Sequence, residues 1–427
     1  MLKRTFYILL LIISIKTYGQ RTNSSPYSFF GIGQQYSSQS VEQASMGGIG
    51  VASSSFYRLN FLNPASFSGL KLTTYNVGVN VNDLTIKDSS GSQKSISTNI
   101  SYINIGFPIS KNAGVAFGLK PNTSVGYSLL NVVNDTKGDP FEATRFYGSG
   151  GTNTIYGAFG VNVYKGLSVG LEAEYIFGKT ENNILNQKAG VSLGTKNNEV
   201  TTIRGSGLKL GVLYKKEFEN KLQMNVGGSI KLENNLTTTG NEYLYSLIIG
   251  NEGRESPRDT LYNSSIKGKL NSPLRTTMGV GFGKESKWYA ALNYEFQSAL
   301  SIQGSLLTTN SFHDYGNSNR ISFGGFYIPK INSISSYWDR VTYRAGVRFE
   351  NTGLLVNGSS STGFTKIKDF GISFGLGLPL KDLSNLNLGI EYGKKGSTIN
   401  NLIQENYFNF KLSLSLNDKW FQKRRID

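Results

Sequence analysis

The sequence predicts an all-β fold, a transmembrane antiparallel β-barrel of about 14 strands with an N-terminal lumenal plug. Three observations predict it. Segments of strict apolar and polar alternation recur along the chain, an export signal precedes them, and the composition suits strands with aromatic girdles. Gly occurs 50 times, Phe 25 times and Tyr 24 times, against 9 Pro and 17% charged residues.

The first residues form an export signal rather than a membrane span. Lys3 and Arg4 precede an apolar stretch from Phe6 to Ile15, which is too short for a spanning helix. We expect residues 1–19 to be a signal peptide that is removed near Gly19. No later run is long and apolar enough for a spanning helix, so helical insertion is excluded. The chain has no cysteine, which excludes disulfides, thiolate metal sites and a lipid-anchored N-terminal cysteine.

Residues 20–72 lack sustained alternation and are rich in Ser, Gly and Gln. Residues 25–34, 44–52 and 59–67 nevertheless carry aromatic or small apolar side chains. This region is too polar to face lipid and too aromatic for a free linker, so we expect it to fold into the lumen as a plug.

The strand pattern is clearest near the C-terminus, where residues 408–416 read FNFKLSLSL. In a strand, Phe408, Phe410 and the leucines would share one face, while Asn409, Lys411 and the serines would share the other. Backbone groups inside a bilayer must pair within the protein, so a spanning sheet has to close into a barrel. We therefore expect the apolar face to meet lipid and the polar face to meet the lumen.

Fourteen such segments follow the plug, and we assign residues 73–417 to the barrel. Most reach the roughly 9 to 11 residues that a tilted strand needs to cross a bilayer. The expected strands are residues 73–87, 94–109, 112–121, 152–164, 167–179, 200–216, 221–236, 264–284, 287–301, 316–330, 338–350, 366–379, 385–396 and 405–417. Short turns alternate with longer polar connections, as expected for periplasmic turns and outer loops. The longer connections are residues 122–151, 180–199, 237–263 and 302–315.

A periplasmic all-β sandwich is the alternative fold, and strand length and loop alternation favour the barrel over it. Extraction separates the two, since a protein released by carbonate or high salt without detergent is not a barrel. The predicted location is the bacterial outer membrane, with the C-terminus on the periplasmic side.

The formal charge of +16 indicates a partner with negative charge, either nucleic acid or a membrane surface. Lys and Arg are spread singly along strands and loops, and an exported protein rarely meets nucleic acid, so an anionic membrane surface is the expected partner. Outer-membrane lipids and lipopolysaccharide supply such a surface. Only the periplasmic tail, residues 418–427, holds a dense basic cluster, QKRR, and a solvated chain end is the simpler explanation of it.

In the N-terminal region a Gly-rich run is followed by Asn63, Pro64 and Ala65, ahead of about fourteen strands. This arrangement resembles the outer-membrane long-chain fatty-acid transporter (FadL) family. The resemblance covers residues 44–70 and 371–421 and implies a barrel closed by a hatch that carries this Asn-Pro-Ala motif. It also implies uptake of hydrophobic molecules from outside and their lateral release beside a kinked third strand. Here the third expected strand contains Gly114, Gly118 and Pro121, which favour a local break.

Nothing in the sequence favours an enzyme, a cofactor or a metal site. His313 is the only histidine and lies in an expected outer loop beside Asp314, where a solvated side chain is far more common than a catalytic one. The inward charges Glu172, Glu174, Arg344, Arg348 and Glu350 are expected to pair with each other or with the plug, with a charge-lined permeation path as the less favoured alternative.

The outer loops carry apolar residues where water is expected. Ligand-capture candidates are Leu129, Leu130, Leu244, Leu247, Ile248, Ile249, Leu306 and Leu307. They would form an outer groove for amphipathic ligands, or they would pack the loops together over the barrel mouth.

Two functions follow from these observations. The first is passive uptake of hydrophobic small molecules such as long-chain fatty acids. The second is a non-transporting barrel subunit of an outer-membrane protein assembly or secretion complex, in which other outer-membrane proteins are the partners.

Overall fold

The computed structural model describes residues 23–250, 253–303, 312–358, 363–380 and 384–419. The predicted signal peptide, its cleavage position near Gly19 and most of the basic tail lie outside these ranges. No helix in the described ranges is long and apolar enough to cross a membrane.

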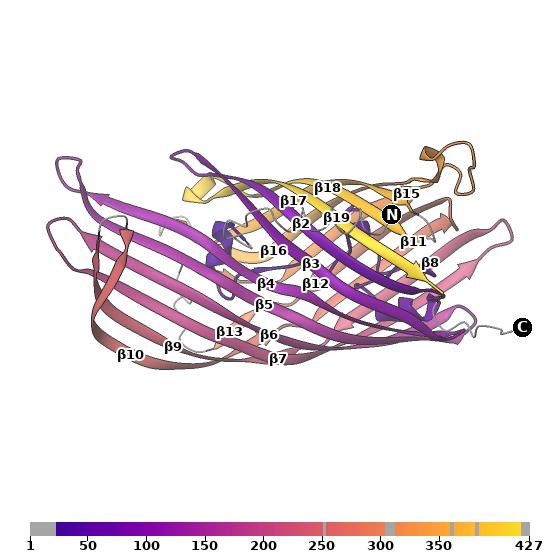
Figure 1. Cartoon of the computed structure of the whole chain (residues 1–427), viewed down its shortest axis with the longest axis horizontal. Helices are drawn as coiled ribbons and strands as arrows, with labels where there is room; N and C mark the ends of the chain where they lie inside the picture. The colour runs from indigo at the N-terminus through magenta and orange to yellow at the C-terminus, as the bar shows by residue number, and fades with distance from the viewer. Residues whose placement is uncertain (1–22, 251–252, 304–311, 359–362, 381–383, 420–427) are drawn as a thin grey trace, which may run out of the picture.

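The described strands form one closed antiparallel barrel (Figure 1). Ten of its fourteen strands are continuous, and each of the other four consists of two consecutive pieces. The barrel closes where β19 pairs with β2 over fifteen residues, from Gln404 opposite Lys87 to Asp418 opposite Thr73. The continuous strands are β2 (Thr73–Lys87), β3 (Ser92–Ser110), β4 (Ala113–Asn134), β5 (Pro140–Tyr164), β6 (Leu167–Lys188), β7 (Gly194–Glu217), β16 (Thr342–Val356), β17 (Thr365–Pro379), β18 (Asn385–Gly396) and β19 (Gln404–Asp418).

The four broken strands are neighbours. They are β8 (Leu222–Lys231) with β9 (Asn234–Ile249), β10 (Glu255–Ser272) with β11 (Arg275–Lys284), β12 (Trp288–Gln297) with β13 (Ser301–Gln303), and β14 (His313–Tyr315) with β15 (Ser318–Tyr327). One break contains Pro273, which has no N–H to donate to a ladder. Below the breaks, β8, β11, β12 and β15 form one continuous ladder. The prediction of about 14 antiparallel strands in a barrel is confirmed.

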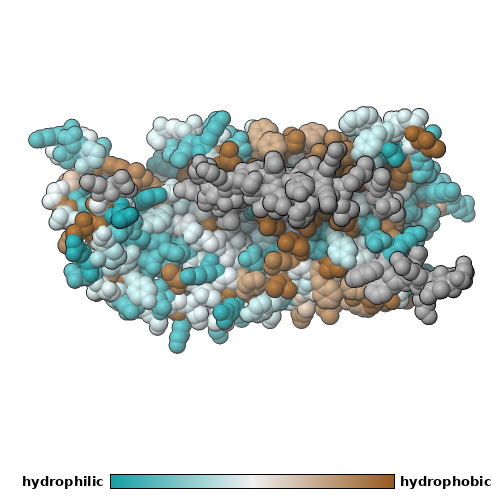
Figure 2. Space-filling view, viewed as in Figure 1, coloured by the Kyte–Doolittle hydropathy of each residue, from teal (hydrophilic) through white to brown (hydrophobic). Residues whose placement is uncertain are grey.

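The alternation in β19 has the predicted orientation. Phe408, Phe410 and Leu412 are 41–47% exposed on the outside of the isolated chain, while Ser413 and Ser415 are 1% and 3% exposed. Apolar side chains, brown in Figure 2, gather over the middle and right of the molecule, whereas its left end is mostly teal and white. The apolar band is the surface that a bilayer would cover.

The strands on one side extend well past this band. In Figure 1, β4 to β7, β9 and β10 reach further left than β2 and β17 to β19. We name this the outer end, because outer-membrane barrels project furthest on the outside. The sequence analysis assigned much of residues 122–151, 180–199 and 237–263 to loops, and the structure corrects this to strands with short turns. The outer face does not meet lipid there, so the apolar alternation that marks a spanning strand is missing.

Residues 23–72 pack against the inward-facing side of the wall. They contain η1 (Pro26–Phe29), β1 (Gln34–Gln35), α2 (Val41–Ala44) and η2 (Pro64–Gly69). Two other short helices, η4 (Trp338–Arg340) and η6 (Ile399–Asn401), lie in connections between barrel strands. Ser40 and Gln43 form a capping box at α2. Four buried apolar clusters each join this segment to the strands, through Phe61, Tyr27, Ile32 and Met46 respectively. The apolar core of the described residues is thus the contact between the segment and the barrel.

We predict that Leu412→Lys destabilises the barrel by about 2–4 kcal/mol, because it places a charge on the lipid-facing side. Urea unfolding in lipid bilayers measures the change. Asn409→Lys is the matched control on the same strand, since Asn409 faces the lumen beside Glu391. Equal losses for the two variants would contradict the assigned orientation of β19.

Candidate functional site

Asn63 fastens the N-terminal segment both to itself and to the barrel. Its side chain is fully buried, and its Oδ1 accepts a hydrogen bond from the Ala65 N–H at 3.0 Å, which caps η2. Its Nδ2 donates to the carbonyl of Val51 at 2.7 Å and to that of Val212 in β7 at 2.9 Å. Only an amide offers this combination of acceptor and donors at one side chain.

Two wall glycines allow the Asn-Pro-Ala motif to approach. A Cβ on Gly170 would lie 2.3 Å from the Ala65 nitrogen, and one on Gly211 would lie 2.2 Å from the Asn63 Oδ1. Pro64 occupies the first turn of η2, where its missing N–H costs nothing. The motif is therefore built into the wall at β6 and β7; that it acts as a hatch stays a prediction.

A first buried ion network lies beside the motif. Glu172, which is fully buried, accepts from the Nζ atoms of Lys120 at 3.0 Å and Lys209 at 2.9 Å. Glu174 pairs with Lys120 at 3.2 Å and with Lys231 at 2.5 Å. Lys209 also donates to the carbonyl of Phe61 at 3.0 Å. Four strands and the N-terminal segment thus meet at two carboxylates.

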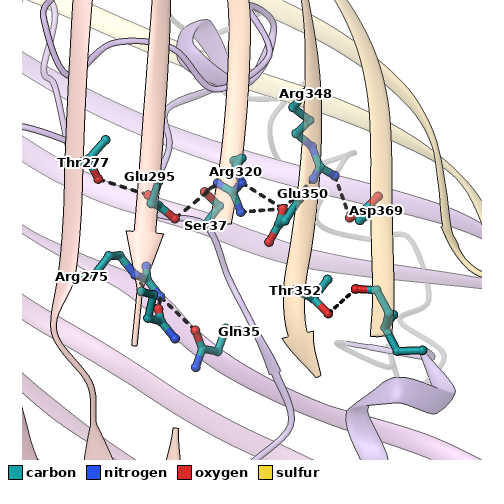
Figure 3. Close-up of polar contacts among 12 residues, drawn as sticks. Gln35, Ser37, Arg275, Thr277, Glu295, Arg320, Arg348, Glu350, Thr352 and Asp369 are labelled. Atoms are coloured by element: carbon teal, nitrogen blue, oxygen red, sulfur yellow. Dashed lines mark hydrogen bonds and ion pairs between the residues drawn. The ribbon is translucent and has the colours of Figure 1, made fainter. Parts of the chain in front are cut away.

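A second ion network crosses β15 to β19 (Figure 3). Arg348 contacts three carboxylates, those of Glu350 at 2.9 Å, Asp369 at 3.0 Å and Glu391 at 2.8 Å. Arg320 pairs with Glu350 at 2.9 Å, and Lys411 pairs with Glu391 at 2.6 Å. Each of these charged side chains therefore has at least one opposite charge beside it.

The N-terminal segment closes this second network from the lumenal side. Ser37 accepts from Arg320 at 2.8 Å, and Gln35 accepts from Arg275 at 2.9 Å, as Figure 3 shows. Ser25 donates to Glu405 on β19. The prediction that inward charges pair is correct for Glu172, Glu174, Arg348 and Glu350. Buried Arg344 makes no ion pair or hydrogen bond with any described residue and is repelled by Arg58.

A cavity of about 300 Å³ with both polar and apolar lining remains between the segment and the network. Its lining includes residues 33–41, inward side chains of β2 and β3, and several charged side chains. The charged ones are Lys120, Arg275, Glu295, Arg320, Arg348, Glu350, Asp369, Glu391, Lys395, Glu405 and Lys411. These charged groups favour water or polar solutes, because an alkyl chain would displace the water that hydrates them, while Phe30, Leu84 and Leu354 add apolar lining.

The third barrel strand, β4, separates from its neighbour β3. Their ladder runs only from Ser110 opposite Ala113 to Ile103 opposite Leu119, whereas the ladder between β4 and β5 continues to Asn134. Gly114 and Gly118 lie in the paired part, and Pro121 lies at a bulge just beyond its end. That this break releases a ligand stays a prediction.

The ligand-capture candidates are not brought together. Leu129 and Leu130 lie on β4, and Leu244 to Ile249 lie on β9, with β5, β6 and β7 between these strands. Leu247 is fully buried, whereas Leu130 is 67% exposed. Their expected position in outer loops is therefore wrong, since they belong to strands; their role in capture stays a prediction. Leu306 and Leu307 fall outside the described ranges.

His313 begins β14 at the outer end and packs against the N-terminal segment. Its ring lies 5.0 Å from that of Phe30 and 5.5 Å from that of Tyr315. Burial lowers the pKa of the imidazole, so the neutral form is favoured. The imidazole therefore forms part of an aromatic cluster with Phe30 and Tyr315.

An apolar recess of about 860 Å³ lies on the outside of the barrel. Ala290, Gly325 and Ala345 stand in register on β12, β15 and β16 and form its floor. The sides include Phe323, Tyr327, Tyr343, Phe374, Leu376 and Ile390. Apolar groups are thus accommodated on the face turned to the membrane.

Sequence reasoning missed most members of the ion networks, including Lys120, Arg320, Asp369, Glu391 and Lys411. Their inward orientation could be predicted, because they are charged residues on the polar side of alternating strands. Their partners could not be predicted, because pairing depends on the register between strands that are distant in the sequence.

The BamG family model matches residues 1–427. Among solved structures, similar ones are the Pseudomonas putida toluene transporter TodX and a Pseudomonas aeruginosa FadL homologue, with TM-scores of 0.60 and identities of 16% and 11%. Each match covers 90% of this chain and 99% of the other. The CymD monoaromatic hydrocarbon channel matches with a TM-score of 0.57 and 14% identity, over 90% of this chain and 98% of CymD. A comparison with curated protein sequences gives no match. At these identities the solved structures establish the fold, a FadL-like outer-membrane barrel.

We predict that Asn63→Asp lowers the free energy of unfolding by at least about 3 kcal/mol, because it places a buried carboxylate against two carbonyl oxygens. Urea unfolding in detergent measures this loss. Asn131→Asp is the control, since Asn131 is exposed on β4. A loss no larger than that of the control would show that the Asn63 contacts do not stabilise the chain.

We predict a loss of about 3–5 kcal/mol for Glu172→Gln, because Lys209 would keep only a carbonyl partner in a buried position. The same unfolding experiment measures it, with exposed Glu219→Gln as control. A neutral result would mean that water or Glu174 compensates the two lysines.

Proposed function

The chain belongs to the BamG family, and from that premise we propose that it is a sealed barrel subunit of an outer-membrane protein assembly or secretion complex. The observation that carries the proposal is that residues 23–72 pack inside the barrel. Residues 23–72 act in this proposal as a plug, held by four apolar clusters and two ion networks.

The chemistry of the cavities supports this function. The cavity inside the barrel is lined by eleven charged side chains together with apolar ones, and the recess with a predominantly apolar lining lies outside, on β12 and β15 to β18. A path for hydrophobic molecules needs apolar lining along the lumen. An apolar recess in the membrane band instead suits contact with lipid or with another membrane protein.

Passive uptake of hydrophobic small molecules, such as long-chain fatty acids, is the second candidate. The likeness to solved structures titled as toluene and monoaromatic hydrocarbon channels favours it, as does the separation of β3 from β4 beyond Leu119. The lumenal charges oppose it, because a passing alkyl chain would displace their water or their partners.

Mass spectrometry of the full-length protein, gently extracted from outer membranes, tests the proposal. We expect a defined complex with other outer-membrane proteins and no stoichiometric apolar ligand. A stoichiometric fatty acid or hydrocarbon without stable protein partners would overturn the subunit function and favour uptake. Purified protein in liposomes gives a second readout, since a sealed barrel does not accelerate entry of a fatty acid.

A further inference from the structure

The outer half of β4 is the edge of a sheet. Beyond the β3 ladder, the outer end consists of β4, β5, β6, β7, β9 and β10, paired in that order. β4 pairs with β5 as far as Asn134, but its other side has lost β3 after Leu119. A strand edge presents unpaired N–H and C=O groups, which form a template for a further strand.

The N-terminal segment already uses the first part of this edge. Gln34 and Gln35 of β1 pair antiparallel with Ser124 and Thr123. The Tyr36 N–H donates to the carbonyl of Asn122 at 2.9 Å. The edge therefore already accepts an extended segment, although β1 contributes only the two residues Gln34 and Gln35.

Beyond β1, side chains of the N-terminal segment pair with backbone groups of this edge as far as Gly126. The Asn23 Nδ2 donates to the Ser124 carbonyl at 3.2 Å, and the Gly126 N–H donates to the Ser28 Oγ at 3.0 Å. The register with β5 has no irregularity between Ser124 and Val133. By the two-residue period, Ser128, Leu130 and Val132 turn their N–H and C=O groups to the same side, where no described residue pairs with them.

The side chains of the uncovered stretch, residues 128–133, are uncharged and mostly apolar, as expected for a strand that pairs with another strand. Residues 128–133 read SLLNVV, without a charge or a proline. Leu130, Val132 and Val133 are 67%, 42% and 49% exposed. Free edges in soluble surroundings usually carry Lys, Pro or a bulge that prevents pairing, and this stretch carries none of them until a register shift at Asn134.

We propose that the β4 edge at residues 128–132 binds an extended, weakly charged segment of a partner protein, which adds to the outer sheet as a β-strand in continuation of β1. The proposal rests on the function as a complex subunit and names the chemistry of one contact. Backbone pairing supplies affinity, and Leu130 and Val132 on the outward face supply apolar contact.

The test uses two variants of this edge in the full-length protein. Leu130→Pro removes one N–H that faces the open side and leaves the bonds to β5, which residues 129 and 131 make. Val132→Lys adds a charge that opposes strand addition. Leu261→Lys is the matched control, because Leu261 is 59% exposed on β10, at the opposite edge of the outer sheet. Folding is checked by heat-modifiable migration, and Val132→Lys decides if Leu130→Pro does not fold.

The readout is photo-crosslinking from a benzophenone side chain at position 130 or 132, together with the amount of protein that copurifies. We expect crosslinks to one short segment of one partner, and a fall of about tenfold in its recovery with each edge variant but not with Leu261→Lys. Recovery of that partner unchanged in both edge variants, or crosslinks to lipid alone, would overturn the inference while leaving the subunit function intact. Absence of any stable partner from the unmodified protein would overturn both.

Discussion

The pairing of backbone groups inside the membrane is the constraint on which this structure depends. A peptide N–H or C=O has no partner in hydrocarbon, so the sheet must close, and it closes through the fifteen residue pairs between β19 and β2. Closure fixes which side chains face out, because they alternate along every strand. The outer side chains then have to be apolar, and the polar half of each strand is directed into a small lumen.

A lumen filled from the polar faces of fourteen strands creates a second problem, since charges are brought together away from bulk water. The chain meets it by pairing opposite charges within and across strands, as Arg348 does with Glu350 on its own strand, with Asp369 on the next and with Glu391 on the one after. The N-terminal segment completes the arrangement with neutral groups, such as the Phe61 carbonyl at Lys209 and the Ser37 hydroxyl at Arg320. A segment that supplies partners to several strands is difficult to displace without exposing unpaired charges. Arg344 is the exception, because it is buried without such a partner among the described residues.

The sequence was sufficient for the barrel because the membrane imposes a local rule that repeats every two residues. FNFKLSLSL could be assigned to lipid and lumen without any knowledge of its neighbours. The rule fails above the membrane, where residues 122–134 remain in β4 although their exposed side chains include the polar residues Ser128 and Asn131. It also says nothing about register, so Lys120 could not be assigned to Glu172, nor Asn63 to the Val212 carbonyl. Those contacts join residues 52 and 149 positions apart, and only the folded chain brings them together.

The same constraint separates what is shared with hydrocarbon channels from what is particular to this chain. Closure and strand number are properties of the wall. Passage of an apolar molecule depends on the lumenal side chains, which closure leaves free to vary as long as their charges are paired. In this chain charged side chains are part of the lumenal lining, and apolar side chains also gather on surfaces that face outward: the recess over β12 and β15 to β18, and the edge of β4. Both follow from closure, since the alternation of side chains directs one half of each strand into the lumen, where charges pair, and the other half outward.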